Sequence, residues 1–289
     1  MTLLQSISPA ACVILAVCGG CREAAPPPSP ALRVSMIPTT DPGKVLRESQ
    51  ALIDFLGTAG KTQVTLTIPS NYAAVVEALV NDQVDLAYLG GFTYVQASAR
   101  AGVVPLVQRD RDQQFHSVFV TQPGSPIQGL LDLKGHSFAF GDVNSTSGHL
   151  MPESFMREAN VDPEVIAKAL YTGGHDATLL AVANGKIDAG ALDEAVFQKM
   201  TQGEQPKVDP KTVRVFLQSP PFFDYVWVAR KGLDPRLQQA FTEAMLGLTD
   251  ASPEGKQVLA LLSAKKYLPA SDASYDRLRQ VARQAGLLK

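Results

Sequence analysis

The chain repeats one short pattern, and this repeat limits the folds that are open to it. The segment "SNYAAVVEALVNDQVDLAYLGG" begins at Ser70, and "GGHDATLLAVANGKIDAGALDE" begins at Gly173. In both segments a helical pattern ends before an apolar strand. At a constant offset the matching positions are Ala74 with Ala177, Ala78 with Ala181, Asn81 with Asn184 and Asp85 with Asp188. The alternative is that any two strand–helix–strand units look alike, because a helix ending in Asn or Gly before an apolar strand is common.

Short β-rich runs alternate with helix-length amphipathic segments from residue 31 onward, which indicates an α/β fold. The first series is strand, helix, strand, helix, strand, over residues 32–38, 44–60, 63–69, 72–82 and 84–90. In the repeat, Tyr72 and His175 occupy equivalent helix starts. Gly90 and Asp193 follow equivalent strands. We therefore expect two similar lobes with these residues along the crevice between them, where open α/β sheets bind ligands.

The later part of the chain indicates a hinge. Two strand-like stretches, "VRVFL" and "YVWVA", are separated by a Pro-Pro turn. A chain that leaves one lobe, builds a second and returns has two crossing strands. The predicted divisions are a leader at 1–21, a Pro-rich tether at 22–30, the first lobe at 31–118, the second lobe at 119–221, and a return to the first lobe with C-terminal helices at 222–289.

Residues 1–21 have the character of a secretory leader. They contain no charged side chain, and their apolar run from Ala10 to Val17 is too short to span a bilayer. We therefore expect export to a periplasmic or other extracytoplasmic location. Cys21, after two glycines and before the tether, is a candidate for lipidation. A plain cleaved signal and a wrongly assigned start codon are the alternatives.

Charge and cysteine content exclude several partners. The chain has 26 Lys+Arg against 28 Asp+Glu, so no basic field is present to attract nucleic acid or a membrane surface. All three cysteines lie in the leader, which leaves the rest of the chain without disulfides or thiolate ligands. A small neutral or anionic ligand is therefore favoured.

The segment "NSTSGHLMP", residues 144–152, is rich in hydroxyl groups just before a predicted helix. One hydroxyl is enough to cap a helix, and in the plainest interpretation the others face water. Ser145, Thr146 and Ser147 together exceed what capping requires. With Gly148 after them, hydroxyl and amide donors and the helix dipole would suit a tetrahedral oxyanion. We therefore predict an anion site here.

A second candidate cluster is "TGGHDA". His175 follows two glycines at a helix start, where it could donate to an oxyanion and titrate near neutral pH. A buried structural histidine is the commoner alternative. Tyr72 and Tyr88 add phenolic donors, or are ordinary half-buried aromatics. Asp193 and Glu194 would suit a ligand that carries a proton or an amine, since a carboxylate accepts that hydrogen.

Enzyme motifs are scarce. The sequence contains no HExxH, GxSxG or GxxxxGK[ST] pattern and no Cys/His metal spacing. His116, His136 and His149 have no metal-like spacing to one another or to His175. We therefore expect no catalytic residue, no metal and no cofactor.

Four segments carry a family resemblance: "NSTSGHLMP", "GGHDATLLAVANGKIDAGALD", "SPIQGLLDLKGHSFAFGD" and "FLQSPPF". Together they resemble the phosphate/phosphite/phosphonate-binding proteins of ABC importers, of the phosphonate-binding type within the type II periplasmic binding proteins. The resemblance covers about Leu32 to Leu262. The Ser-Thr-Ser-Gly segment joined to a Gly-His-acidic segment is its specific part.

The resemblance implies a two-lobed α/β fold, each lobe a mixed sheet flanked by helices, joined by two hinge strands. It implies these ligand-binding positions: oxyanion donors at Ser145, Thr146, Ser147 and His175, cleft tyrosines at Tyr72 and Tyr88, and an acidic position at Asp193 or Glu194. The chain departs from many relatives at "SPPFFDYV", so the cleft wall near Phe222 and Asp224 is expected to differ.

The implied function is the extracytoplasmic solute-binding component of an ABC importer. It would be a monomer that captures phosphate, phosphite or a phosphonate between its lobes and delivers it to a membrane permease. The alternative is a periplasmic sensor of an oxyanion, such as an arsenic oxyanion, that signals to a histidine kinase. A hydrolase is a third interpretation, which the scarcity of enzyme motifs disfavours.

Overall fold

The computed structural model describes residues 31–162, 166, 168–203 and 205–288. The predicted leader at 1–21 with Cys21, and the tether at 22–30, lie outside the described residues. Within the described part of the chain, no helix is both long and apolar enough to cross a membrane.

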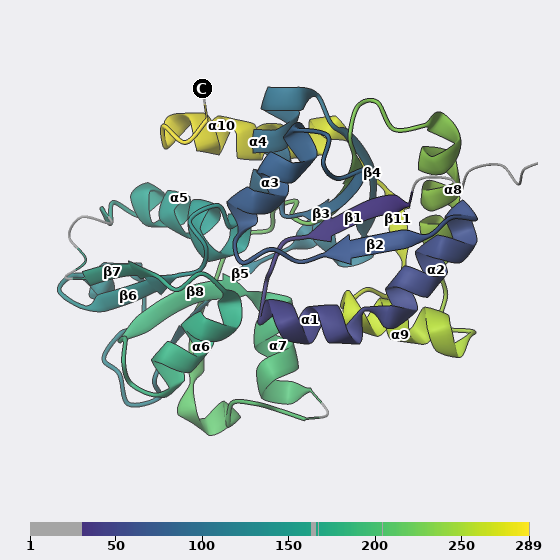
Figure 1. Cartoon of the computed structure of the whole chain (residues 1–289). Helices are drawn as coiled ribbons and strands as arrows, with labels where there is room; N and C mark the ends of the chain where they lie inside the picture. Colours follow the sequence, from purple (N-terminus) through teal and green to yellow (C-terminus); the bar gives the residue numbers. More distant parts are fainter. Residues whose placement is uncertain (1–30, 163–165, 167, 204, 289) are drawn as a thin grey trace, which may run out of the picture.

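The first lobe, which we call lobe I, is built on a six-stranded sheet (Figure 1). Its strands are β1 (Leu32–Met36), β2 (Val64–Thr67), β3 (Leu86–Leu89), β4 (Val104–Arg109), β10 (Val226–Ala229) and β11 (Tyr267–Pro269). The strand order is β11-β4-β10-β3-β1-β2. β1 is parallel to both neighbours, whereas β10 runs antiparallel to β3 and β4. Because β10 follows the second lobe in sequence, the returning chain completes lobe I.

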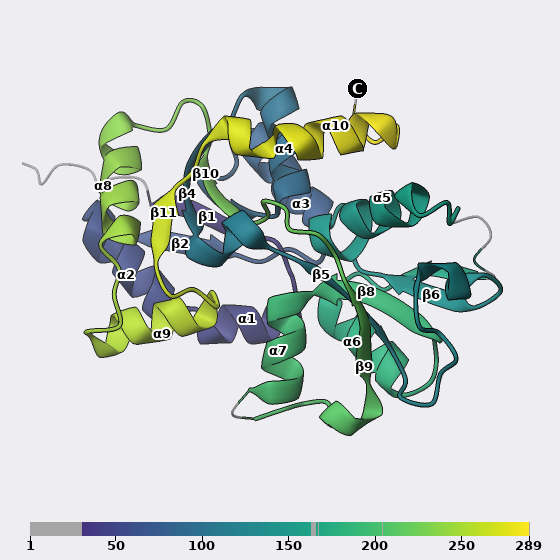
Figure 2. The same ribbon diagram turned by 180° about the vertical axis from the view of Figure 1, so that it is seen from behind.

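Helices cover both faces of this sheet. They are α1 (Pro42–Glu48), α2 (Gln50–Gly60), α3 (Tyr72–Val80), α4 (Gly91–Ala101), α8 (Pro235–Leu246), α9 (Pro253–Leu261) and α10 (Asp276–Gln284). Figures 1 and 2 show α3, α4 and α10 on one side and α2, α8 and α9 on the other.

The predicted helix over residues 44–60 is broken at Ser49, between α1 and α2. The Ser49 hydroxyl donates to the carbonyl of Val45 (2.6 Å), and its N–H donates to the carbonyl of Leu46 (3.2 Å). A serine side chain that bonds to nearby backbone competes with the helical pattern. Apolar spacing alone did not predict this break.

The second lobe, lobe II, is built on a five-stranded sheet of order β7-β6-β8-β5-β9. Its strands are β5 (Ser117–Thr121), β6 (Ser137–Phe140), β7 (Lys168–Tyr171), β8 (Ala189–Asp193) and β9 (Arg214–Gln218), and its helices are α5 (Met151–Glu158), α6 (His175–Ala183) and α7 (Glu194–Gln202). A single π-helical turn, Thr146–Leu150, leads into α5. Short 3₁₀ turns lie at Asp110–Gln114, Leu130–Leu133, Pro210–Thr212 and Asp272–Tyr275.

Lobe II has an apolar core on each face of its sheet. Phe119 belongs to the core beneath α5, while its neighbours Val118 and Val120 belong to the core beneath α6 and α7, as the alternation of a strand requires. The core of lobe I also includes Leu150 and Phe155 from lobe II. The two lobes are therefore packed against each other at this edge.

The repeat seen in the sequence is confirmed by matching hydrogen bonds. Asn81 and Asn184 each donate from the side-chain amide to the carbonyl four residues earlier, at 2.8 Å. Asp85 accepts from the N–H of Arg33 (2.9 Å) in β1. Asp188 accepts from the N–H of Ser137 (2.7 Å) in the equivalent strand β6. The matched side chains therefore have the same structural role in both lobes.

The two connections between the lobes cross at one point. Phe115 lies between β4 and β5, and Phe222 lies between β9 and β10. Each donates its N–H to the carbonyl of the other, at 2.9 and 3.0 Å. This crossing is the hinge-like arrangement that the sequence predicted.

Candidate binding site

Five helix starts meet where the two lobes touch. They belong to α3 and α4 of lobe I, and to α6, α7 and the π turn before α5 of lobe II. Hydrogen bonds join α3 to α6 and α6 to α7, and another joins α4 to the π turn. The first amides of a helix have no acceptor within the helix, and the helix dipole is positive at that end. Such a meeting point attracts an anion.

The serine–threonine loop, residues 144–148, lies at the centre of this arrangement. The Ser145 hydroxyl oxygen accepts from the N–H of Gly148 (3.0 Å), and the Thr146 oxygen accepts from the N–H of Phe92 in lobe I (3.0 Å). Ser147 is buried, and its hydroxyl has no hydrogen-bond partner among the described residues. Ser145 is thus the residue of this segment that acts as the cap. Among the three hydroxyl groups of the loop, that of Ser147 is therefore the one without a partner in the described chain.

Gly148 lets the imidazole of His175 lie directly against the loop. A Cβ atom at this position would lie 2.9 Å from Cε1 and 3.1 Å from Nδ1 of the ring. Any side chain here would displace the ring or the loop. The glycine that ends "STSG" therefore sets the close approach of the two predicted donor groups.

The environment of His175 fixes its protonation. Its side chain is fully buried, and the N–H of Asp193 donates to Nδ1 (3.3 Å). Burial lowers the pKa of His175, so the ring is neutral and does not titrate near neutral pH as the sequence suggested. Since Nδ1 is an acceptor, the neutral ring carries its proton on Nε2. Nε2 lies 3.3 Å from the hydroxyl of Tyr72 across the crevice.

Tyr72 is the lobe I counterpart of His175. Its side chain is buried, and burial raises its pKa well above the usual value, so the phenol keeps its proton. Its N–H donates to Asp142 Oδ2 of lobe II (3.3 Å). The two residues that the repeat places at equivalent helix starts therefore meet across the crevice.

The start of α4 is open to lobe II because Gly90 has no side chain. The N–H of Gly91 donates to Asp224 Oδ1 (3.0 Å). A Cβ atom on Gly90 would lie 3.1 Å from Thr146 Oγ1 and 3.3 Å from Asp224 Oδ1. The first amides of α4 have no acceptor within their own helix. They thus bind a threonine hydroxyl and a carboxyl group side by side.

Asp224 is a buried carboxyl group with an elevated pKa. Burial is the main cause, with the nearby charges of Asp112 and Asp193 adding to it, and the pKa rises to about 7. Its Oδ2 is buried and has no partner among the residues described. A protonated Asp224 can donate a hydrogen bond that an ionised carboxylate cannot.

Asp193 caps its own helix and holds a hinge tyrosine. Its Oδ1 accepts from the N–H groups of Ala195 (2.5 Å) and Val196 (3.0 Å), and its Oδ2 accepts from the hydroxyl of Tyr225 (2.8 Å). The ring of Tyr88 stacks on Tyr225, with 5.3 Å between centroids. The Tyr88 hydroxyl is buried and, within the described chain, has no hydrogen-bond partner.

Glu194 points away from this cluster. It forms an ion pair with Arg111 (3.2 Å), which lies in the 3₁₀ turn before β5. The structure therefore brings together six of the eight predicted positions: Tyr72, Ser145, Thr146, Ser147, His175 and Asp193. For all eight positions, contact with a ligand stays a prediction.

Sequence reasoning missed part of the site. It did not identify Asp142 or the backbone amides of α4, and it named Asp224 only as part of a variable wall. The repeat did contain one signal. Gly90 occupies the place of Asp193, so the equivalent helix in lobe I lacks its side-chain cap.

The arrangement suits binding better than bond breaking. Ser145 lies next to His175, but Nδ1 of the ring accepts from backbone and Nε2 faces Tyr72, so neither nitrogen is placed to take the serine proton. Within the described ranges, no group of three or more His, Cys, Asp or Glu side chains could hold a metal ion.

Comparison with known proteins agrees with this geometry. Residues 34–275 match the family model for the periplasmic substrate-binding protein of phosphonate ABC transporters. A probable ABC transporter phosphite-binding protein, PhnD1 of Prochlorococcus marinus (strain MIT 9301), is 33% identical over 232 residues, which cover 76% of this chain and 77% of the relative. The phosphate-import protein PhnD of Mycolicibacterium smegmatis is 27% identical, with 88% and 86% covered.

The solved structure of PhnD1 from Prochlorococcus marinus in complex with methylphosphonate superposes with a TM-score of 0.82 at 31% identity, covering 89% of this chain and 99% of that one. The chain therefore belongs to the family of phosphonate-binding periplasmic substrate-binding proteins of ABC transporters. The predicted type II periplasmic binding protein fold is confirmed. The chain is an extracytoplasmic solute-binding component of a transporter and not an enzyme; the comparisons do not support the sensor alternative.

Proposed function

We infer that the ligand of this chain is a small phosphorus oxyanion: phosphate, phosphite or a phosphonate. The observation that carries this inference is the set of buried donors that both lobes direct to one point. Lobe II supplies the hydroxyls of the serine–threonine loop and the imidazole N–H of His175. Lobe I supplies the hydroxyl of Tyr72, and the start of α4 fixes Thr146 and Asp224 beside it. Hydroxyl, amide and imidazole donors recognise a tetrahedral oxyanion without an ion pair.

Capture would proceed in two steps. In an open form, lobe II binds the oxyanion through Ser145, Ser147 and His175. Closure about the hinge would then bring Tyr72 against the ligand, while the start of α4 holds Thr146 and Asp224 beside it. Closure requires that the ligand gain more contacts in the closed form than in the open one. The donors of lobe I supply that difference.

The protonation state of Asp224 would affect how strongly the site binds an anion. With a pKa of about 7, it carries a proton in slightly acidic solution and can donate to an oxyanion oxygen. Above that pH the ionised group would repel the anion. The oxyanion site thus contains one group whose charge changes in the neutral range.

A thermal-shift screen followed by calorimetric titration would test this function. Phosphite, methylphosphonate and phosphate are the ligands, and acetate is the control for any anion. We expect at least one phosphorus oxyanion to raise Tm by several degrees at millimolar concentration, since a ligand that binds the folded state alone stabilises it. A screen in which all three behave like acetate would contradict the proposed function.

Three further proposals accompany this function. The chain would act as a monomer, deliver its ligand to an ABC permease, and be anchored through a lipid on Cys21. Light scattering of the purified protein tests the first. Copurification with the permease tests the second. Mass spectrometry of the mature N-terminus tests the third.

A further inference from the structure

The segment "NSTSGHLMP" contains one titratable side chain that the proposed oxyanion site does not use. His149 follows Gly148 directly, at the end of the serine–threonine loop, and its side chain is only 3% exposed. Burying an imidazole costs free energy unless its nitrogens are hydrogen-bonded. Both nitrogens of His149 have partners within the protein, so neither is left for a ligand.

Nδ1 of this ring holds the peptide group that leads into the loop. It lies 2.7 Å from the carbonyl oxygen of Val143. A carbonyl only accepts, so Nδ1 carries a proton and donates it. The N–H of the same peptide group, which belongs to Asn144, donates to Asp142 Oδ1 (2.7 Å). Both ends of this peptide group are therefore bonded, which fixes its orientation one residue before Ser145.

Nε2 of the ring has a partner in either charge state. Glu153 Oε2 lies 3.0 Å from it, and the hydroxyl of Tyr171 lies 2.9 Å from it. The hydrogen bond from His149 lowers the pKa of Glu153, so this group is an acceptor, whereas burial raises the pKa of Tyr171, so the phenol keeps its proton. Nε2 therefore donates to the carboxylate when it carries a proton and accepts from the phenol when it does not. The bond from Nδ1 to Val143 is available in both states.

Aromatic rings fix the plane of the imidazole. Phe140, the last residue of β6, packs perpendicular to it with 5.3 Å between centroids. Tyr171, the last residue of β7, packs perpendicular to it at 4.9 Å. The residue after Phe140, Gly141, donates its N–H to the carbonyl of Gly148 (2.9 Å). The ends of two strands of lobe II therefore hold the ring beside the loop.

Asp142 connects the same peptide group to lobe I. Its Oδ1 accepts from the N–H of Asn144, and its Oδ2 accepts from the N–H of Tyr72 at the start of α3 (3.3 Å). One carboxylate thus joins the entrance of the loop to the helix of lobe I that carries the phenol. A shift of this peptide group would displace a contact between the lobes as well as the loop.

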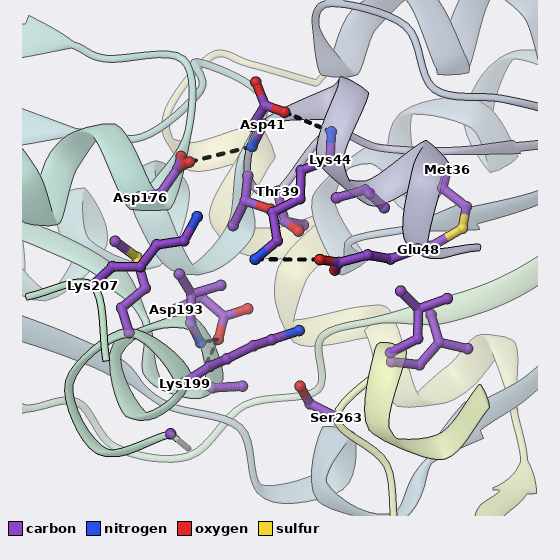
Figure 3. Close-up of a pocket in the computed structure, with 18 of the residues that line it drawn as sticks. Met36, Thr39, Asp41, Lys44, Glu48, Asp176, Asp193, Lys199, Lys207 and Ser263 are labelled. Atoms are coloured by element: carbon purple, nitrogen blue, oxygen red, sulfur yellow. Dashed lines mark hydrogen bonds and ion pairs between the residues drawn. The ribbon is translucent and has the colours of Figure 1, made fainter. Parts of the chain in front are cut away.

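His149 lies outside the wall of the cavity between the lobes. That cavity has a volume of about 660 Å³, and its lining includes Asp176, Asp193 and Lys199 (Figure 3). Neither His149 nor any residue of the serine–threonine loop belongs to the lining. A substitution of His149 therefore leaves the cavity wall unchanged, and would affect a ligand through the loop.

We propose that His149 is a positioning residue: its Nδ1–H, bonded to the carbonyl of Val143, holds the serine–threonine loop in the shape that the oxyanion site requires. The ring contacts no ligand, and the three hydroxyl side chains of the loop do. The effect of His149 on ligand affinity rests on the proposed function, whereas its effect on the loop does not.

Three substitutions of His149 in the full chain separate positioning from packing. His149→Ala removes the ring. His149→Asn keeps a side-chain N–H at the place of Nδ1, and His149→Gln keeps one at the place of Nε2 and is closer to histidine in volume. His136→Ala is the matched control. It removes a partly exposed imidazole of the same lobe, which lies 3.6 Å from Asp188 at the opposite end of β6 from the loop.

Calorimetric titration with methylphosphonate is the first measurement. We expect His149→Ala and His149→Gln to bind at least about tenfold more weakly than the wild type, and His149→Asn to bind within about threefold of it, since one buried hydrogen bond is lost or kept. If only packing mattered, glutamine would bind better than asparagine. That order would overturn the proposal, and so would wild-type affinity in the alanine variant. The asparagine and glutamine variants decide the question if the alanine variant does not fold.

Hydrogen exchange in the free protein is the second measurement, and it needs no ligand. The amides of Asn144, Ser145 and Gly148 each have an acceptor within residues 142–148, so a loop that is held in place protects them. We expect these amides to exchange about tenfold or more faster in the alanine and glutamine variants, and at nearly the wild-type rate in His149→Asn and in the control.

Exchange at the wild-type rate in all variants would overturn the proposal. If methylphosphonate does not bind the wild-type chain, the proposed function fails. The exchange rates still decide in that case whether His149 holds the loop.

Discussion

The two lobes are copies of one strand–helix pattern, yet they differ at two positions of the proposed site. Where lobe II has Asp193, which caps the start of α7, lobe I has Gly90, which leaves the start of α4 open. Where lobe II has the imidazole of His175, lobe I has the phenol of Tyr72. The shared fold places the helix starts opposite each other, and the residues at these two positions determine which chemical groups each lobe presents there. In lobe II, Asp193 accepts from the first amides of its own helix α7, whereas in lobe I the first amides of α4 donate to Asp224 and to Thr146 of lobe II.

Replacing Gly90 of lobe I by the aspartate that lobe II has at the matching position should have the largest effect on ligand affinity. In Gly90→Asp the new Cβ would lie 3.1 Å from Thr146 Oγ1, and a second carboxylate would enter beside Asp224. We expect loss of methylphosphonate affinity by about 100-fold or more, because an added buried charge of like sign opposes both closure and the anion. Calorimetric titration measures it.

Gly129→Asp is the matched control, since nothing lies within 4 Å of a Cβ at that position. It should bind as the wild type does. A Gly90→Asp variant of unchanged affinity would show that the open start of α4 does not contribute to binding.

Substitutions of His175, at the second position where the lobes differ, should have a smaller effect on ligand affinity. His175→Ala removes the imidazole donor, and we expect affinity to fall by about tenfold or more, as for a hydrogen bond to a charged group. His175→Gln keeps an N–H donor of similar reach and should recover part of the loss. If the alanine variant binds as tightly as the wild type, His175 is not a ligand contact.

The titration of Asp224 should make binding depend on pH. Its pKa of about 7 implies that wild-type affinity for methylphosphonate falls between about pH 5.5 and pH 8.5, as the carboxyl group loses its proton. Asp224→Asn cannot ionise. We expect the ratio of wild-type to variant affinity to fall by about tenfold over this range, which also cancels the titration of the ligand itself. A constant ratio would remove Asp224 from the site.

Substitutions of the matched aspartates Asp85 and Asp188 should have the smallest effects, and these effects concern only the stability of the fold. Asp85 is nearly buried and bonds to both Arg33 and Arg230, and its pKa falls to about 2. Asp85→Asn should lower the free energy of unfolding at pH 7 by about 3 kcal/mol. Asp188→Asn, whose side chain is half exposed and bonds to Ser137, should cost about 1 kcal/mol or less.

Urea unfolding compares these two variants. The lowered pKa also gives a sign for pH: the contribution of Asp85 is complete above about pH 4 and is lost as the pH falls towards 2. If both substitutions lower the free energy of unfolding equally, the different burial of Asp85 and Asp188 has no effect on stability.

The sequence predicted the two-lobed fold and the residues that lie at helix starts, because apolar spacing and the repeat determine both. It predicted Ser145 and His175 as neighbours only through the family resemblance, since they are far apart in the chain. It could not predict the roles of Asp224 or the α4 amides. These depend on contacts across the crevice, between lobes whose relative position no local pattern encodes. The neutral state of His175 was missed for the same reason, because burial at the interface sets it.

The measurement that tests the account most directly is the calorimetric affinity of Ser145→Ala/Thr146→Ala for methylphosphonate beside that of the wild type. Both hydroxyl oxygens accept from backbone amides, Ser145 from Gly148 and Thr146 from Phe92, which holds the two side chains at the meeting point of the lobes. The account predicts that the wild type binds and that the variant binds at least about tenfold more weakly. Equal affinity of the folded variant would contradict the assignment of the serine–threonine loop as the oxyanion site.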